Sequence, residues 1–140
     1  MAEPYDDWLK RKLAQEPIEL RQAWTVSRKW ERITGGRILF AELTLTAEPS
    51  SAFAYLEKVV WPTDYLYFKH CVLDGILDGV LIDLARAPTY LSFTLNAINW
   101  HEEHSVPRAY YRAAREAIGE IFASDERAFF APLFDEGSSE

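Results

Sequence analysis

The fold is decided by residues 24–47, which read WTVSRKWERITGGRILFAELTLTA. Two consecutive glycines, Gly35 and Gly36, interrupt a long run of strand-forming residues. Glycine readily adopts the positive φ angles that a tight hairpin turn requires. After the turn, apolar and polar residues alternate as far as Ala47, which is the period of a strand with one buried face. The stretch therefore predicts a β-hairpin that turns at Thr34–Arg37.

Two more strands and two helices are predicted downstream of the hairpin. Period-two patterns mark strands at residues 53–60 and 91–96. A helix is predicted between them, from about Thr63 to Gly79, and a second, amphipathic helix begins at Ser105. The predicted fold is α+β, with a four-stranded mixed sheet and two helices on one face.

The predicted chain reversals bring three connections to one end of the sheet, which we call the tip. Strand one runs up to the Gly35-Gly36 turn, strand two returns, and each later strand or helix reverses the direction again. The segments 60–63 and 97–105 are therefore expected to join the turn at the tip. Both chain termini are expected at the opposite end.

The composition describes one acidic domain with a basic segment. The chain has 140 residues, a net charge of −7 at pH 7 and a single cysteine, so it can bury a core without disulfides. Residues 10–37 contain eight basic and three acidic residues, a net charge of 8 − 3 = +5. The overall charge argues against general coating of nucleic acid, but one end of the molecule could still attract phosphate.

The location expected from the sequence is the cytoplasm, with no membrane contact. The chain opens with Met-Ala-Glu-Pro rather than with a basic region followed by an apolar stretch. No apolar run approaches the roughly 18 to 20 residues that a membrane span needs.

Several short motifs resemble domain IV of translation elongation factor G in their order and spacing. They lie within residues 16–133, which leaves residues 1–15 as an extension and 134–140 as an acidic tail. The positions that carry the resemblance are Lys29-Trp30, Thr34–Arg37, Trp61–Tyr65, Gly79–Leu81, Phe93–Leu95, Trp100-His101, Ser105, Ala109-Tyr110 and Phe129–Leu133.

This resemblance implies a fold and a partner. The fold would be that of ribosomal protein S5 domain 2, with an unusual left-handed crossover between the parallel strands, whereas the general rule favours a right-handed one. The partner would be the ribosome, because the tip segments of the family touch the decoding region and the tRNA–mRNA duplex. The residues expected to contact RNA or another partner at the tip are Thr34, Gly35, Gly36, Arg37, Trp61, Trp100 and His101, supported by the basic residues Arg28, Lys29 and Arg32.

Trp61 and Trp100 have two interpretations. Aromatic rings beside the tip can stack on exposed bases, which contributes about 1 to 3 kcal/mol per base. The same rings can instead cover the open end of the core. The sequence leaves both open.

The chain also departs from the family pattern. After Arg37 the family has Gly-Gln-Tyr-Gly-His, whereas this chain has the largely apolar Ile38–Glu42. Glu102 and Glu103 follow His101 and would repel phosphate. These changes leave a second hypothesis open: a protein-interaction or self-associating domain that has lost RNA binding.

No enzymatic activity, nucleotide, cofactor or metal is expected. The chain has no Gly-x-x-x-x-Gly-Lys-Ser/Thr loop to cradle phosphates. His101 and His104 do not have the four-residue spacing that places two zinc ligands on one helical face. We therefore expect a non-catalytic, stand-alone module that is associated with translation.

Overall fold

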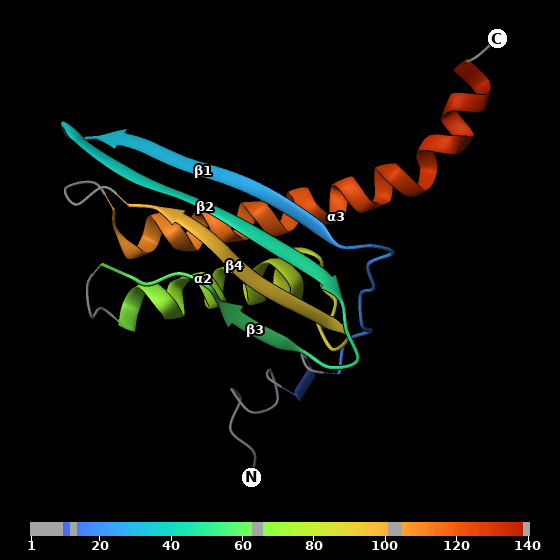
Figure 1. Cartoon of the computed structure of the whole chain (residues 1–140), viewed down its shortest axis with the longest axis horizontal. Helices are drawn as coiled ribbons and strands as arrows, with labels where there is room; N and C mark the ends of the chain where they lie inside the picture. The colour runs from blue at the N-terminus through green and yellow to red at the C-terminus, as the bar shows by residue number, and fades with distance from the viewer. Residues whose placement is uncertain (1–9, 12–13, 63–65, 101–104, 139–140) are drawn as a thin grey trace.

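The computed structural model describes residues 10–11, 14–62, 66–100 and 105–138 (Figure 1). Within these residues a sheet of four strands packs against two helices. In chain order the elements are β1 (Trp24–Thr34), β2 (Arg37–Pro49), β3 (Ala54–Glu57), α2 (Leu66–Asp78), the π-helical turn η1 (Gly79–Asp83), β4 (Leu91–Asn99) and α3 (Pro107–Ser138). The expected α+β architecture is confirmed.

The sheet is mixed, in the strand order β1-β2-β4-β3. β2 pairs antiparallel with both β1 and β4, and β3 pairs parallel with β4. In Figure 1 both helices lie behind the sheet, and the chain passes from β3 up to β4 through α2. In that view β3 and β4 both run to the left, and α2 passes behind the sheet from β3 to β4 above it. This arrangement is a left-handed crossover.

The β1–β2 hairpin has the predicted turn. Gly35 and Gly36 have φ angles of +57° and +77°, as a two-residue hairpin turn requires. The pairing runs without a shift from Thr34↔Arg37 to Trp24↔Ala47. Every second residue of β1 therefore faces the helices, and the residues between them lie on the open face of the sheet.

The two helices approach closely at two glycines of α2 and η1. A Cβ atom at Gly75 would overlap the Tyr111 carbonyl oxygen, and one at Gly79 would lie 2.8 Å from the Ile118 side chain. The α-helix ends at the predicted position, because α2 stops at Asp78, directly before Gly79. Gly79 packs against Ile118, and the chain continues as η1, where the Leu84 N–H donates to the Gly79 carbonyl at 3.1 Å.

β3 is shorter than the predicted strand 53–60, while β4 extends the predicted 91–96 to Asn99. Because β4 reaches Asn99, part of the expected connection 97–105 is strand. One backbone hydrogen bond continues past β3, from the Lys58 N–H to the Leu95 carbonyl at 2.9 Å. The chain then leaves the sheet toward Trp61, whose ring packs against the core.

The N-terminal segment is fixed to α3 by a buried carboxylate. Asp125 accepts hydrogen bonds from the Trp24 indole Nε1 at 2.8 Å and from the Arg21 Nη1 at 3.1 Å. Arg21 also lies over the Phe129 ring of α3, 3.7 Å from its centroid, and the helix continues to Ser138, across the expected boundary at residue 133. In the described part of the chain, no helix has the length and apolarity to cross a membrane.

Substituting Gly75→Ala should lower the free energy of unfolding by about 1–3 kcal/mol, because the added methyl group would overlap the backbone of α3. The matched control is Gly119→Ala on α3, where an added Cβ meets nothing within 4 Å. This control should raise stability by up to about 1 kcal/mol through helix propensity. Urea unfolding measures both, and equal effects would contradict the close approach of the helices.

Candidate functional site at the tip

The β1–β2 hairpin projects beyond the rest of the sheet. The last residue of β4, Asn99, pairs with Glu42, and beyond it Ser105 forms a bridge with Phe40. The hairpin continues past Phe40 for three more residues of β2, about 10 Å at the rise of a strand, and ends in its turn. We call residues 31–39 the arm. Its residues from 31 to 38 are all exposed, and Figure 1 shows it at the end where β4 stops.

The arm has two chemically different faces. Ile33 and Ile38 are direct cross-strand partners, with 70% and 36% of their surface exposed. Because side chains alternate along a strand, Arg32 and Arg37 lie on the opposite face, together with Thr34. One face of the arm therefore carries the two exposed isoleucines beside Glu31, and the other carries the two arginines beside Leu39.

Two of the four expected basic residues are engaged by carboxylates. The Arg28 guanidinium lies 2.9 Å from Glu116 and 3.7 Å from Glu120, both on α3. Lys29 lies 3.7 Å from Glu31 on its own strand. Their charges are thus partly neutralised within the molecule.

Arg32 and Arg37 differ from these two. Among the residues that the structure describes, no carboxylate lies within ion-pair distance of either one. Both side chains sit on an exposed arm, where an arginine without a partner can bind phosphate or carboxylate. The face of the arm with the two arginines is therefore available for an anionic partner.

Other features strengthen the positive character of this end. Both α2 and α3 begin at the tip end of the sheet (Figure 1), and neither has an acidic residue in its first turn. A helix N-terminus carries a partial positive charge. Lys58, just after β3, and Arg108, in the first turn of α3, are exposed, and neither forms an ion pair within the described ranges.

Trp61 and Trp100 belong to an aromatic cluster that closes the core below the arm. Their ring centroids are 6.4 Å apart, and the Phe68 ring lies 5.5 Å from Trp61 and 4.8 Å from Trp100. Tyr110 completes the cluster and donates its hydroxyl to the Asn99 carbonyl at 3.0 Å. Both tryptophans are half-buried, so packing accounts for much of their surface. Their contact with a partner stays a prediction.

One half-buried carboxylate anchors this cluster to the sheet edge. Glu57 accepts hydrogen bonds from the Tyr55 hydroxyl at 2.6 Å and from the Trp61 indole Nε1 at 3.4 Å. Burial, followed by the neighbouring Glu57, raises the pKa of Tyr55 well above its usual value. Burial also raises the pKa of Tyr110. Both phenols therefore stay protonated and serve as hydrogen-bond donors.

The structure brings most of the expected tip residues to one end of the sheet, but at different positions along the arm. Thr34 to Arg37 form the end of the arm, whereas Trp61 and Trp100 lie at its base. His101, like His104, lies outside the described residues. Within the described ranges, no three His, Cys, Asp or Glu side chains gather as a metal site.

Sequence reasoning missed several exposed residues at the tip. Val60, next to Trp61, is 92% exposed, and Ile33 is the next most exposed large apolar residue. The alternation of Arg32 with Ile33 in the sequence was a signal for the two faces of the arm. The exposure of Val60 had no such signal, because it depends on where the chain leaves β3.

Comparison with known proteins supports the fold. No protein-family profile matches the chain, and no curated protein matches it by sequence. The crystal structure of protein ttk003000868 from Thermus thermophilus superposes on 81% of this chain with a TM-score of 0.67 and 19% identity. The matched region is 18% of that protein, so the chain spans less than a fifth of its length. This likeness shows the fold alone.

Replacing Trp61 with alanine should lower the free energy of unfolding by about 2–4 kcal/mol, because its ring packs against three other aromatic rings. Arg37→Ala, at the exposed end of the arm, should change stability by less than about 0.5 kcal/mol. Chemical denaturation with near-ultraviolet circular dichroism measures both. A fully stable Trp61→Ala variant would show that the tryptophan does not support the core.

Proposed function

We propose that this chain is a non-catalytic module associated with translation, whose tip contacts ribosomal RNA or a ribosome-bound partner. The observation that carries the proposal is the arm, with Arg32 and Arg37 on one exposed face and with no carboxylate partner in the described part of the chain. The two arginines of the arm can bind an anion but supply no group that would catalyse a reaction on it.

The arm favours the phosphate backbone of RNA over the edges of its bases. Arginine side chains bind phosphate oxygens through two parallel hydrogen bonds, and such contacts give affinity without sequence preference. Gly35 and Gly36 have no side chains, so a phosphate can come close to the backbone at the turn. The positive helix N-termini behind the arm act in the same direction.

The link to translation depends on the motif resemblance. Thr34–Arg37, Trp61–Tyr65 and Trp100-His101 keep the order of elongation factor G domain IV, and the arm is formed by the first of them. The Thermus thermophilus protein supports only the shared fold, because the name under which its structure is known describes no activity.

A second candidate function is protein binding at the same tip. Ile33, Ile38 and Val60 are exposed there, and exposed apolar residues at a projecting site are typical anchors of a protein interface. In that case the face of the arm with the two isoleucines would carry the affinity, and the arginines would contribute little.

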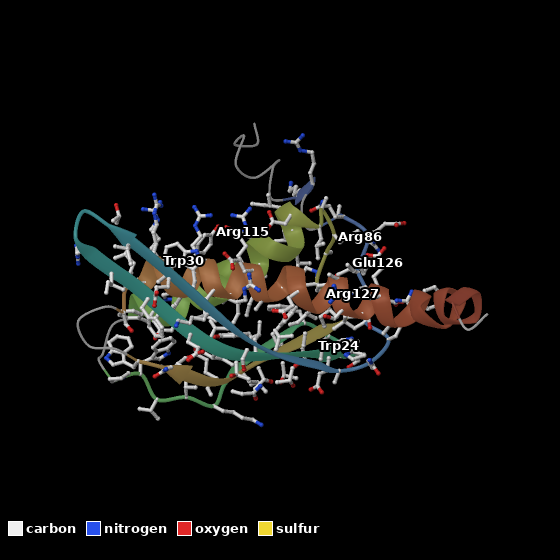
Figure 2. All side chains as sticks on the ribbon, turned by 90° about the horizontal axis from the view of Figure 1, so that it is seen from above. Trp24, Trp30, Arg86, Arg115, Glu126 and Arg127 are labelled. Carbon is white, nitrogen blue, oxygen red and sulfur yellow. The ribbon has the colours of Figure 1, made fainter. Side chains whose placement is uncertain are left out.

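The double substitution Arg32→Ala/Arg37→Ala should weaken co-sedimentation with ribosomes at low salt. For RNA contact, it should also flatten the slope of log K against log salt by about 1.4–1.8, since each phosphate contact contributes about 0.7–0.9. The control is Arg127→Ala, an exposed arginine near the opposite end of the domain, labelled on α3 in Figure 2. This control should bind as the unmodified chain does.

Two outcomes would contradict the proposal. One is no association of the unmodified chain with ribosomes at low salt. The other is equal loss of binding in the double variant and in Arg127→Ala, because that result assigns the effect to net charge rather than to the arm. Loss of binding on Ile33→Ala without any change in salt slope would favour the protein-binding alternative.

A further inference from the structure

Among the residues that the structure describes, no strand pairs with the outer edge of β1. β1 has eleven residues, and its one partner among the described strands is β2. Since Thr34 and Arg37 close a two-residue turn, the even-numbered residues of β1 exchange hydrogen bonds with β2. The backbone groups of the odd-numbered residues therefore point outward, and none has a backbone partner in the described part of the chain. These residues are Thr25, Ser27, Lys29, Glu31 and Ile33.

The charges beside this edge are unbalanced on the helix side of the sheet. Two carboxylates, Glu116 and Glu120, face the single guanidinium of Arg28. Among the described residues the buried Oε2 atom of Glu120 has no hydrogen-bond partner, and the Arg28 Nη1 lies 3.7 Å from it. Four residues along the same face of β1, Arg32 has no carboxylate partner among the described residues. Beside the outer edge of β1, Glu116 and Glu120 therefore carry one negative charge more than Arg28 balances. Arg32 carries a positive charge that no described carboxylate balances.

We infer that a second copy of this chain pairs with β1, edge to edge and antiparallel, with Trp30 opposite its own counterpart on a two-fold axis. This register places Lys29 opposite Glu31 of the partner subunit on the open face, and the symmetry repeats the pair. On the helix side it places Arg28 opposite Arg32 of the partner subunit. That second guanidinium can then reach the surplus charge of Glu116 and Glu120.

The neighbouring registers are electrostatically worse. Sliding the partner strand by two residues in one direction places Lys29 opposite its own counterpart, and sliding it in the other direction does the same to Glu31. Like charges directly opposite each other destabilise a strand pair. A slide by one residue would place residues whose backbone N–H and C=O groups point outward opposite residues whose groups point toward β2. The hydrogen bonds between the two strands could then not form. On the open face, only the register centred on Trp30 satisfies both conditions. On the helix side it places Arg28 opposite Arg32 of the partner subunit, and the carboxylates of Glu116 and Glu120 offset the repulsion between the two guanidinium groups.

The geometry of the edge suits such a partner. β1 is the outer strand of the sheet in Figure 1, where α3 crosses behind it, and Figure 2 labels Trp30 on it. Each outward-facing pair would exchange two backbone hydrogen bonds. Trp30 is half-buried, and two tryptophans opposite each other would form an aromatic cross-strand pair. The pairing shares Arg32 with the function proposed for the tip but does not use Arg37. Substitution of Glu31 disturbs the pairing and leaves both arginines in place, so the two proposals can fail separately.

Sedimentation velocity of the full chain at a series of concentrations tests the inference. The unmodified chain should dimerise, and Glu31→Lys should raise the dimer dissociation constant about tenfold or more, because two opposite-charge pairs become like-charge pairs. The double exchange Lys29→Glu/Glu31→Lys restores opposite charges in the same register and should restore the dimer. A monomer at all concentrations, or a dimer that Glu31→Lys leaves unchanged, would overturn the inference.

Disulfide trapping tests the register separately. In a Cys71→Ser background, Trp30→Cys should form a covalent dimer, because directly opposed, non-hydrogen-bonded residues have the Cα separation that a disulfide needs. Arg32→Cys should not link to itself but should link to Arg28→Cys when the two variants are mixed. The mixed pair keeps the test valid if Trp30→Cys does not fold. Self-linking of Arg32→Cys, or no link in the mixture, would overturn the register.

Discussion

Gly35 and Gly36 hold φ angles of +57° and +77°, which residues with side chains adopt only at a cost. This turn fixes how β1 pairs with β2, and the pairing decides which residues face the helices. A shift of one residue would bury Lys29 and Glu31 and expose Trp24, Val26 and Trp30. The core, the two faces of the arm and the outward-pointing edge of β1 all depend on this one register.

The charges show how an acidic chain can have a positive end. Arg21 is bound by the buried Asp125, and Arg28 is held by carboxylates of α3, so much of the basic segment is neutralised in the folded state. The cations without carboxylate partners in the described ranges include Arg32 and Arg37 on the arm. A net charge of −7 therefore does not describe the surface that a partner would meet at the tip.

The sequence predicted those parts of the fold that depend on local sequence patterns. Alternation and the two glycines determined the hairpin, and amphipathic spacing determined the second helix. Contacts between distant residues were not predictable: Arg28 and Glu116 are 88 positions apart. The end of the α-helix at Gly79 was predicted correctly, but only the fold reveals that Gly79 packs against Ile118. Whether Trp61 packs or stays free depended on Phe68 and Tyr110, whose positions follow from how both helices cross the sheet.

The central claim is that the arm and the adjoining end of the domain form the surface that meets the partner. Hydroxyl-radical footprinting of the chain with and without ribosomes tests it directly, because Ile33, Ile38 and Val60 are exposed at the tip, while Leu56 and Tyr90 are exposed elsewhere. The account predicts that ribosomes protect the first three residues and leave Leu56 and Tyr90 reactive. Protection centred on Leu56 and Tyr90, with the arm unchanged, would contradict it.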